Sequence, residues 1–236
     1  MYDELLVTEL RQVLTACEKV HLPVFVIGAF SVRAYDCLFR ASQDLDLAVT
    51  SKHWPKLKQL LESLGYSVAP DQVWITAVKP LGESQIEINV ALDGVTDLNS
   101  AITYPLTPHH PERHQPADLD FGLPVLPLEA VLITKLIALR DQDVADVLGI
   151  LLQRGDDIQS ERFWQFARAA HIARPVRERL QRVIDYLSSG EALSVWYDRT
   201  GALLTDTERD AALVIVQRLL KSQSPQIGRA SCRERV

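Results

Sequence analysis

The sequence predicts an α+β fold: a mixed sheet flanked by helices in the first half of the chain, followed by a helical C-terminal region. In the first half, short runs of alternating apolar and polar residues, typical of strands, are interleaved with segments of helical spacing. In the second half, the apolar residues recur almost throughout at helical spacing. We therefore expect an α+β domain over residues 1–125 and a helical domain over residues 126–226.

Composition and charge exclude several classes of protein. The chain has 236 residues, 47% hydrophobic and 24% charged, which is typical of an ordered globular protein. No apolar run approaches the ~20 residues of a membrane span, and the acidic amphipathic N-terminus differs from a signal peptide. The three cysteines lie far apart and form no disulfide framework or zinc motif. We expect a cytoplasmic protein without a membrane partner, and with a net charge of −6 a nucleic-acid partner would require a local basic patch.

Each element of the first half has its own signal. Leucines at helical spacing predict a helix over residues 3–20, and residues 24–27 predict a short buried strand that ends at Gly28. A helix over residues 30–38 follows. After a strand around residues 44–49, a helix over residues 54–64 is expected, capped by Ser51 and ended by Gly65. Residues 66–79 and 84–91 predict two further strands, separated by a turn at residues 80–82.

From residue 93 onward, the sequence predicts a long loop followed by helices. Residues 93–123 are rich in proline and histidine and show little periodicity, so we expect mostly loop there. Helices are predicted near residues 128–139, 143–152, 160–172, 174–188 and 207–220.

Two predicted strands carry acidic residues on one face. Residues i and i+2 of a strand point to the same side, so Asp44 and Asp46 share a face while their neighbours enter the core. In the second strand, Glu87 stands opposite an apolar row, and Asn89 faces the same way and competes for its role. Like charges held close together repel unless a cation neutralises them, and carboxylate oxygens suit Mg²⁺. The pattern indicates a magnesium site.

The order of these motifs resembles the nucleotidyltransferase superfamily of the polymerase-β type. The order is an apolar strand, Gly28, a helix, the Asp44–Asp46 pair and then a carboxylate on a later strand. Residues 40–46 are similar to the Arg-x-Thr-x-Asp-hydrophobic-Asp motif of the abortive-infection (AbiEii/AbiGii-like) nucleotidyltransferase toxins. Residues 126–147 look like another block of that family, in which a helical lysine, here Lys135, precedes a segment rich in arginine and aspartate. The resemblance spans roughly residues 20–170.

This resemblance implies transfer of a nucleoside monophosphate from an NTP to an acceptor hydroxyl. In this family pattern Asp44 and Asp46 hold two Mg²⁺ ions, and Glu87 ligates the second ion and accepts or orients the acceptor's proton. The implied nucleotide-binding residues are Gly28, Ala29, Ser31, Arg40, Ser42 and Lys135, supported by Arg140, Asp143 and Asp146. The helical domain completes the NTP site. A tRNA end, a protein side chain or a small molecule would serve as acceptor, and a cognate antitoxin would be the protein partner.

Two departures from the family pattern keep alternatives open. The family usually has Gly-Gly or Gly-Ser at the phosphate turn, whereas this chain has Gly28 and Ala29. Its third acid is usually aspartate, whereas Glu87 is one methylene longer. One alternative is an antibiotic-modifying nucleotidyltransferase, which shares the sheet and the acids. Another is a catalytically degenerate module that binds a nucleotide or a partner.

The last ten residues, 227–236, resemble the translation of a sequencing adapter. On this interpretation Cys232 and the three arginines of the tail are not native, and we expect a non-native tail there.

Overall fold

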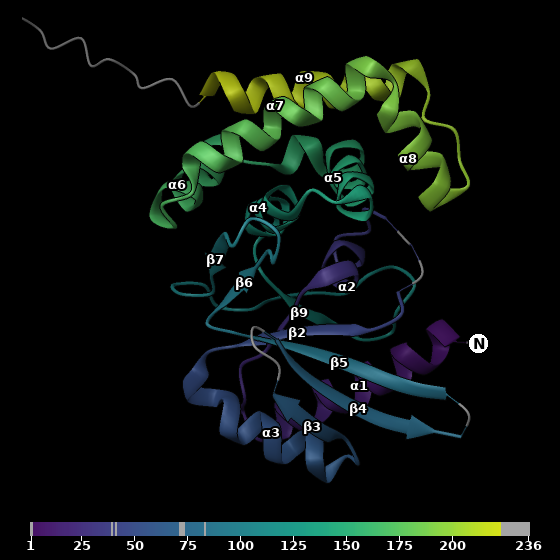
Figure 1. The fold of residues 1–236 in the computed structure, drawn as a ribbon, viewed down its shortest axis with the longest axis vertical. Helices are drawn as coiled ribbons and strands as arrows, with labels where there is room; N and C mark the ends of the chain where they lie inside the picture. The colour runs from purple at the N-terminus through teal and green to yellow at the C-terminus, as the bar shows by residue number, and fades with distance from the viewer. Residues whose placement is uncertain (1, 39, 41, 71–73, 83, 223–236) are drawn as a thin grey trace, which may run out of the picture.

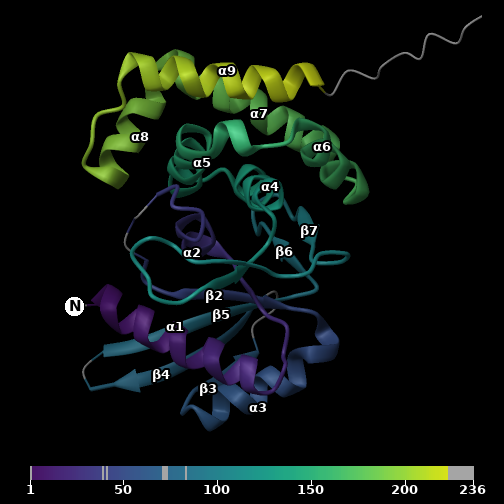
Figure 2. The same cartoon turned by 180° about the vertical axis from the view of Figure 1, so that it is seen from behind.

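The computed structural model describes residues 2–38, 40, 42–70, 74–82 and 84–222, so the tail at 227–236 lies outside the described residues. Figure 1 shows a sheet with α1 (Tyr2–Lys19) passing behind it and α3 (Trp54–Ser63) near its lower edge. The other helices lie above the sheet. Figure 2, seen from behind, shows α1 in front of the sheet, with its lower end near α3, which it contacts.

The central sheet is mixed, as the sequence predicts. Its seven strands follow the order β3-β4-β5-β2-β1-β9-β8. β2 is parallel to β5 and β1 is parallel to β9, whereas the other neighbours are antiparallel. The strands are β1 (Phe25–Val26), β2 (Leu45–Val49), β3 (Ser67–Pro70), β4 (Ile75–Leu81), β5 (Ser84–Leu92), β8 (Glu112–His114) and β9 (Leu123–Val125). A separate hairpin is formed by β6 (Gly94–Thr96) and β7 (Thr103–Pro105).

The alternation of β2 and β5 separates the core from the polar face. The apolar row of these two adjacent strands is almost completely buried: Leu45, Leu47, Val49, Ile86, Ile88 and Val90. Burying such side chains contributes about 1.5–3 kcal/mol each, which holds the register of the pair. A shift of one residue would turn the acidic residues into the core. The predicted apolar rows are therefore confirmed.

The upper layer is helical. It contains α2 (Gly28–Arg33), α4 (Leu128–Ala138), α5 (Asp141–Arg154), α6 (Ser160–Ala169), α7 (Ala173–Ser189), α8 (Glu191–Thr200) and α9 (Asp206–Ser222). In both cartoon views α2 lies next to the sheet, α4 and α5 lie above it, and α6–α9 pack around α4 and α5 on the outside. A helical C-terminal region is thus present, while its separation as a domain at residue 126 stays a prediction. No helix in the described ranges has the length and apolarity to cross a membrane.

Several short elements differ from the predictions. The strand expected over residues 66–79 is two strands, β3 and β4, and β4 continues to Leu81. The segment expected as loop, residues 93–123, contains β6, β7, β8 and the first residue of β9. The helix expected over residues 30–38 begins at Gly28 and ends at Arg33, and α8 has no counterpart among the predicted helices. Strands of three residues show no measurable alternation, so their pairing partners decide that they form.

Candidate active site

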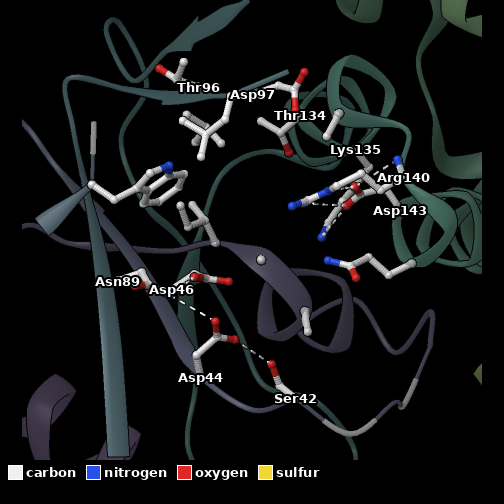
Figure 3. Close-up of a pocket in the computed structure, with 18 of the residues that line it drawn as sticks. Ser42, Asp44, Asp46, Asn89, Thr96, Asp97, Thr134, Lys135, Arg140 and Asp143 are labelled. Atoms are coloured by element: carbon white, nitrogen blue, oxygen red, sulfur yellow. Dashed lines mark hydrogen bonds and ion pairs between the residues drawn. The ribbon is translucent and has the colours of Figure 1, made fainter. Parts of the chain in front are cut away.

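A cleft of about 590 Å³ opens between the polar face of the sheet and the helices above it. Figure 3 shows Asp44 and Asp46 on the sheet side, with Lys135, Arg140 and Asp143 across the cleft. All of the predicted site residues except two line it: Gly28, Ala29, Arg40, Ser42, Asp44, Asp46, Glu87, Lys135, Arg140 and Asp143. The tertiary structure therefore gathers residues that lie more than 100 positions apart in the sequence.

The two aspartates share one hydrogen-bond donor. Asp46 pairs with Asn89 in the parallel register of β2 and β5, so their side chains stand on the same face. Asn89 Nδ2 donates to Asp44 Oδ2 at 3.0 Å and to Asp46 Oδ1 at 3.3 Å. The Ser42 hydroxyl lies 3.3 Å from Asp44 Oδ1 and donates to it. The sheet therefore holds the pair of carboxylates with neutral donors.

The Asp46 carboxylate is poorly compensated. Burial and the adjacent charge of Asp44 raise its pKa from 3.8 to about 6, although Lys135, the Asn89 amide and Arg140 oppose the shift. A carboxylate with a raised pKa is one whose negative charge is disfavoured by its surroundings. A cation placed between the two aspartates would remove this penalty.

This penalty makes the stability of the metal-free protein depend on pH. Since folded Asp46 holds its proton more tightly than in the unfolded chain, stability falls as the pH rises from about 4 through 6. In EDTA at pH 7.5, Asp46→Asn is expected to raise the free energy of unfolding by about 1–3 kcal/mol. At pH 4 the gain is close to zero. Urea unfolding at both pH values checks this, with the fully exposed Asp156→Asn as control, and an equal effect at the two pH values would contradict it.

Gly28 makes room for the site. Its φ of +66° is a left-handed conformation, and a Cβ built there would lie 2.0 Å from Asp46 Oδ2. The family resemblance implies that this residue lets the backbone approach a triphosphate, and it lines the cleft together with Ala29. Its position shows a second requirement, because only glycine leaves space for the Asp46 carboxylate.

Glu87 and Ser31, two more of the predicted site residues, differ in their relation to the cleft. Glu87 lies two residues before Asn89 on β5 and lines the cleft. Ser31 lies within α2, is 2% exposed and donates its hydroxyl to the Gly28 carbonyl at 2.8 Å. The structure thus places Glu87 in the same cleft as the aspartates, whereas the Ser31 hydroxyl is used inside its own helix.

A network of charges covers the opposite side of the cleft. Lys135 on α4 lies 2.7 Å from Asp146 Oδ2 and 3.6 Å from Asp143 Oδ1 on α5. Arg40 donates to both oxygens of Asp146, at 2.8 and 3.1 Å. Arg140, the N-cap residue of α5, donates its Nε to Asp143 Oδ2 at 2.7 Å and forms a capping box with it. Three cations therefore share two carboxylates.

Asp146 is the anchor of this network. It is completely buried, and burial acts to raise its pKa, but Lys135 and Arg40 outweigh burial and lower it. It therefore stays ionised and holds both cations. Lys135 is 5% exposed and yet lines the cleft, whereas Asp146 supports it from behind. The network carries one excess positive charge, which faces the two aspartates across the cleft.

Several residues that line the cleft were not predicted from the sequence. Trp74 and Thr76 from the β4 region and Thr96, Asp97 and Leu98 from the β6 hairpin also line the cleft. The sequence pattern predicts loop at the hairpin, and no motif surrounds Trp74. Its only sequence signal is a large aromatic residue just before a short strand, which ordinarily indicates core.

The donors on the sheet suit a hard divalent cation. Two carboxylates of the same face, one of them with a raised pKa, match the oxygen ligands of Mg²⁺. No group of three or more histidine, cysteine, aspartate and glutamate side chains arranged for a metal occurs within the described residues. The three carboxylates predicted as metal ligands, Asp44, Asp46 and Glu87, are therefore not gathered into such a group, and the candidate metal site consists of the two aspartates.

The sequence matches no protein-family model and no curated protein. Solved structures of similar fold include ANT(2'')-Ia in complex with adenylyl-2''-tobramycin, with 15% identity and a TM-score of 0.46 over 70% of this chain and 96% of that chain. The lincomycin-bound lincosamide antibiotic adenylyltransferase LnuA has 17% identity and a TM-score of 0.43 over 61% and 94%. An antigenic nucleotidyltransferase-like protein from Paracoccidioides brasiliensis has 13% identity and a TM-score of 0.45 over 79% and 93%.

Proposed function

We propose that this protein is a Mg²⁺-dependent nucleotidyltransferase that moves a nucleoside monophosphate from an NTP to an acceptor hydroxyl. The observation that carries the proposal is the division of charge in one cleft. A pair of carboxylates, Asp44 and Asp46, faces a cationic wall that contains Lys135 and Arg140. A metal site opposite a cationic wall is what a magnesium–triphosphate substrate requires.

Each side of the cleft has a defined task in this proposal. Asp44 and Asp46 hold the metal, and Lys135 and Arg140 bind the outer phosphates. Two Mg²⁺ ions bound at the aspartates would neutralise the triphosphate and activate the attacking hydroxyl. Glu87 lines the same cleft, and in the family pattern it would ligate the second ion and accept or orient the proton of the acceptor. Gly28 and Ala29 border the phosphates on the remaining side.

The acceptor that we favour follows from the resemblance of residues 40–46 and 126–147 to abortive-infection toxins. We propose transfer to RNA, for instance to a tRNA end, by a toxin that a cognate antitoxin would restrain. Arg140, whose side chain is 54% exposed at the cleft, offers a cation to a polynucleotide as well as to the triphosphate.

A second candidate is transfer to a small cationic acceptor, such as an antibiotic. Glu87 and Asp97 both line the cleft beyond the aspartate pair, and carboxylates favour amino groups. A third possibility is a degenerate module, in which this cleft binds a nucleotide but catalyses no transfer.

One labelled-transfer assay separates these functions. The protein is incubated with each α-labelled NTP, Mg²⁺ and either total RNA or a panel of aminoglycosides and lincosamides. We expect label in RNA, and a loss of about 10³-fold or more in Asp46→Asn, since several kcal/mol of charge stabilisation disappear. Asp156→Asn, at a fully exposed aspartate outside the cleft, is expected to retain activity.

The outcomes discriminate among the candidates. Label in an antibiotic and not in RNA would favour the second candidate. NTP binding that depends on Mg²⁺ and Asp46, without any transfer, would indicate the degenerate module. An absence of Mg²⁺-dependent NTP binding, with Asp46→Asn indistinguishable from the wild type, would contradict the nucleotidyltransferase proposal.

A further inference from the structure

Asn89 occupies the place between the two aspartates. Its Nδ2 lies 3.0 Å from Asp44 Oδ2 and 3.3 Å from Asp46 Oδ1, so one amide donor bridges both carboxylates. A cation held by the same two oxygens would lie where this donor now points. The amide hydrogens and a cation repel each other, so the present orientation of Asn89 suits only the metal-free site.

The opposite end of the same amide is an oxygen. A rotation about the last side-chain bond exchanges Oδ1 and Nδ2 with almost no change in shape. The amide oxygen is a hard neutral donor of the kind that joins carboxylates around Mg²⁺ and Ca²⁺. Asn89 can therefore stabilise the pair of aspartates without a metal, and can also ligate a metal after the rotation.

Thr76 permits both orientations. It pairs with Asn89 in the register of β4 and β5, and its hydroxyl lies 3.4 Å from Asn89 Oδ1. A hydroxyl both donates and accepts, so it can donate to Oδ1 in the metal-free state and accept from Nδ2 after the rotation. The second orientation leaves no amide group of Asn89 without a partner.

We propose that Asn89, and not Glu87, completes the protein ligand set of the cation at Asp44 and Asp46, with its amide turned so that Oδ1 faces the ion. This inference rests on the proposed function, and it revises the ligand role assigned to Glu87. Asn89 stands level with Asp46 and contacts both aspartates, whereas Glu87 lies two residues away, about 7 Å along the strand. Glu87 is thereby left to the acceptor.

Binding of Mn²⁺ to the metal-free protein tests the ligand assignment without any turnover. Free Mn²⁺ is measured by electron paramagnetic resonance for the wild type and two matched truncations, Asn89→Ala and Glu87→Ala. We expect Asn89→Ala to weaken Mn²⁺ binding about tenfold or more, and Glu87→Ala to change it less than twofold. The reverse order, with Glu87→Ala weak and Asn89→Ala unchanged, would overturn the proposal.

Asn89→Asp separates a ligand from a structural hydrogen-bond donor. Both Asn89→Ala and Asn89→Asp lack the amide donor, so a purely structural role would make them bind Mn²⁺ alike. A ligand role requires an oxygen at this position, so Asn89→Asp is expected to bind Mn²⁺ at least as tightly as the wild type. Its melting temperature in EDTA is expected to fall, because a third carboxylate joins two others. Equal weakening in both variants would overturn the proposal.

Thr76→Val tests the rotation. The hydroxyl is a partner of the Asn89 amide in both orientations, so Thr76→Val removes one hydrogen bond from the metal-free state and one from the metal-bound state, and we expect Mn²⁺ binding to change less than about threefold. A weakening of tenfold or more would contradict a partner role in both orientations. The two proposals fail differently: if Asp46→Asn abolishes Mn²⁺ binding and Asn89→Ala does not, only the role of Asn89 fails. If the wild type binds neither Mn²⁺ nor magnesium–NTP, the proposed function fails.

Discussion

Asp146→Ala is expected to lower the free energy of unfolding by about 3–5 kcal/mol, the usual cost of removing one partner from a buried ion pair. Asp146 is fully buried and accepts hydrogen bonds from Arg40 and Lys135, both of which are largely withdrawn from water. Without it, Lys135 loses its 2.7 Å partner and keeps the 3.6 Å contact with Asp143, and Arg40 loses its bidentate acceptor. Urea unfolding at pH 7.5 measures the loss.

Two further variants identify its cause. Asp156 also pairs with an arginine, at 3.8 Å, but its side chain is 99% exposed, so Asp156→Ala is expected to cost less than about 0.5 kcal/mol. In the double variant Asp146→Ala/Lys135→Met, part of the loss should return, because one buried charge is removed together with its partner. A cost for Asp146→Ala no larger than that of Asp156→Ala would contradict the anchoring role.

Gly28→Ala is expected to damage both folding and the site. The left-handed φ of +66° disfavours any residue with a Cβ by about 1–2 kcal/mol. The new methyl would also meet Asp46 Oδ2 at 2.0 Å, so the carboxylate has to move away from its hydrogen bond with Asn89. A displacement of about 1 Å at a catalytic group lowers the rate about 100-fold. We therefore expect a destabilisation of about 2–4 kcal/mol, with nucleotide transfer reduced about 100-fold or more.

Gly201→Ala is the matched control for this substitution. Gly201 has nearly the same φ, +69°, but among the described residues no atom beyond its own backbone and its chain neighbours lies within 4 Å of the point where its Cβ would stand. The variant is expected to show the conformational cost alone, with transfer unchanged. If both alanine variants behaved alike in unfolding and in transfer, the close contact with Asp46 would not explain the effect of Gly28→Ala.

Much of the site could be predicted from local patterns. The period of two in β2 and β5 placed Asp44, Asp46 and Glu87 on one face and their apolar neighbours in the core. This worked because a strand with one buried face permits only one register. The helices were predicted equally well where they are long, since apolar spacing over several turns leaves little ambiguity.

Other features depend on contacts between distant segments. The wall formed by the β6 hairpin escaped prediction because its strands are three residues long and their pairing is decided by neighbours. The Ser31 hydroxyl, expected at a phosphate, bonds within α2, which local spacing could not reveal. From the sequence, Asn89 and Glu87 are alternative candidates for the same role. The register of β2 and β5 then shows that Asn89 pairs with Asp46.

The sequence by itself determined the α+β class, the two acidic strands and their shared face, because backbone geometry links each residue to the side on which it lies. Only the tertiary structure decided which cations face that side and what lies between the carboxylates. Arg40 and Lys135 lie 106 and 11 positions from Asp146 in the sequence, and both contact it in the structure. The strength of these ion pairs depends on how deeply they are buried, which cannot be predicted from the local sequence.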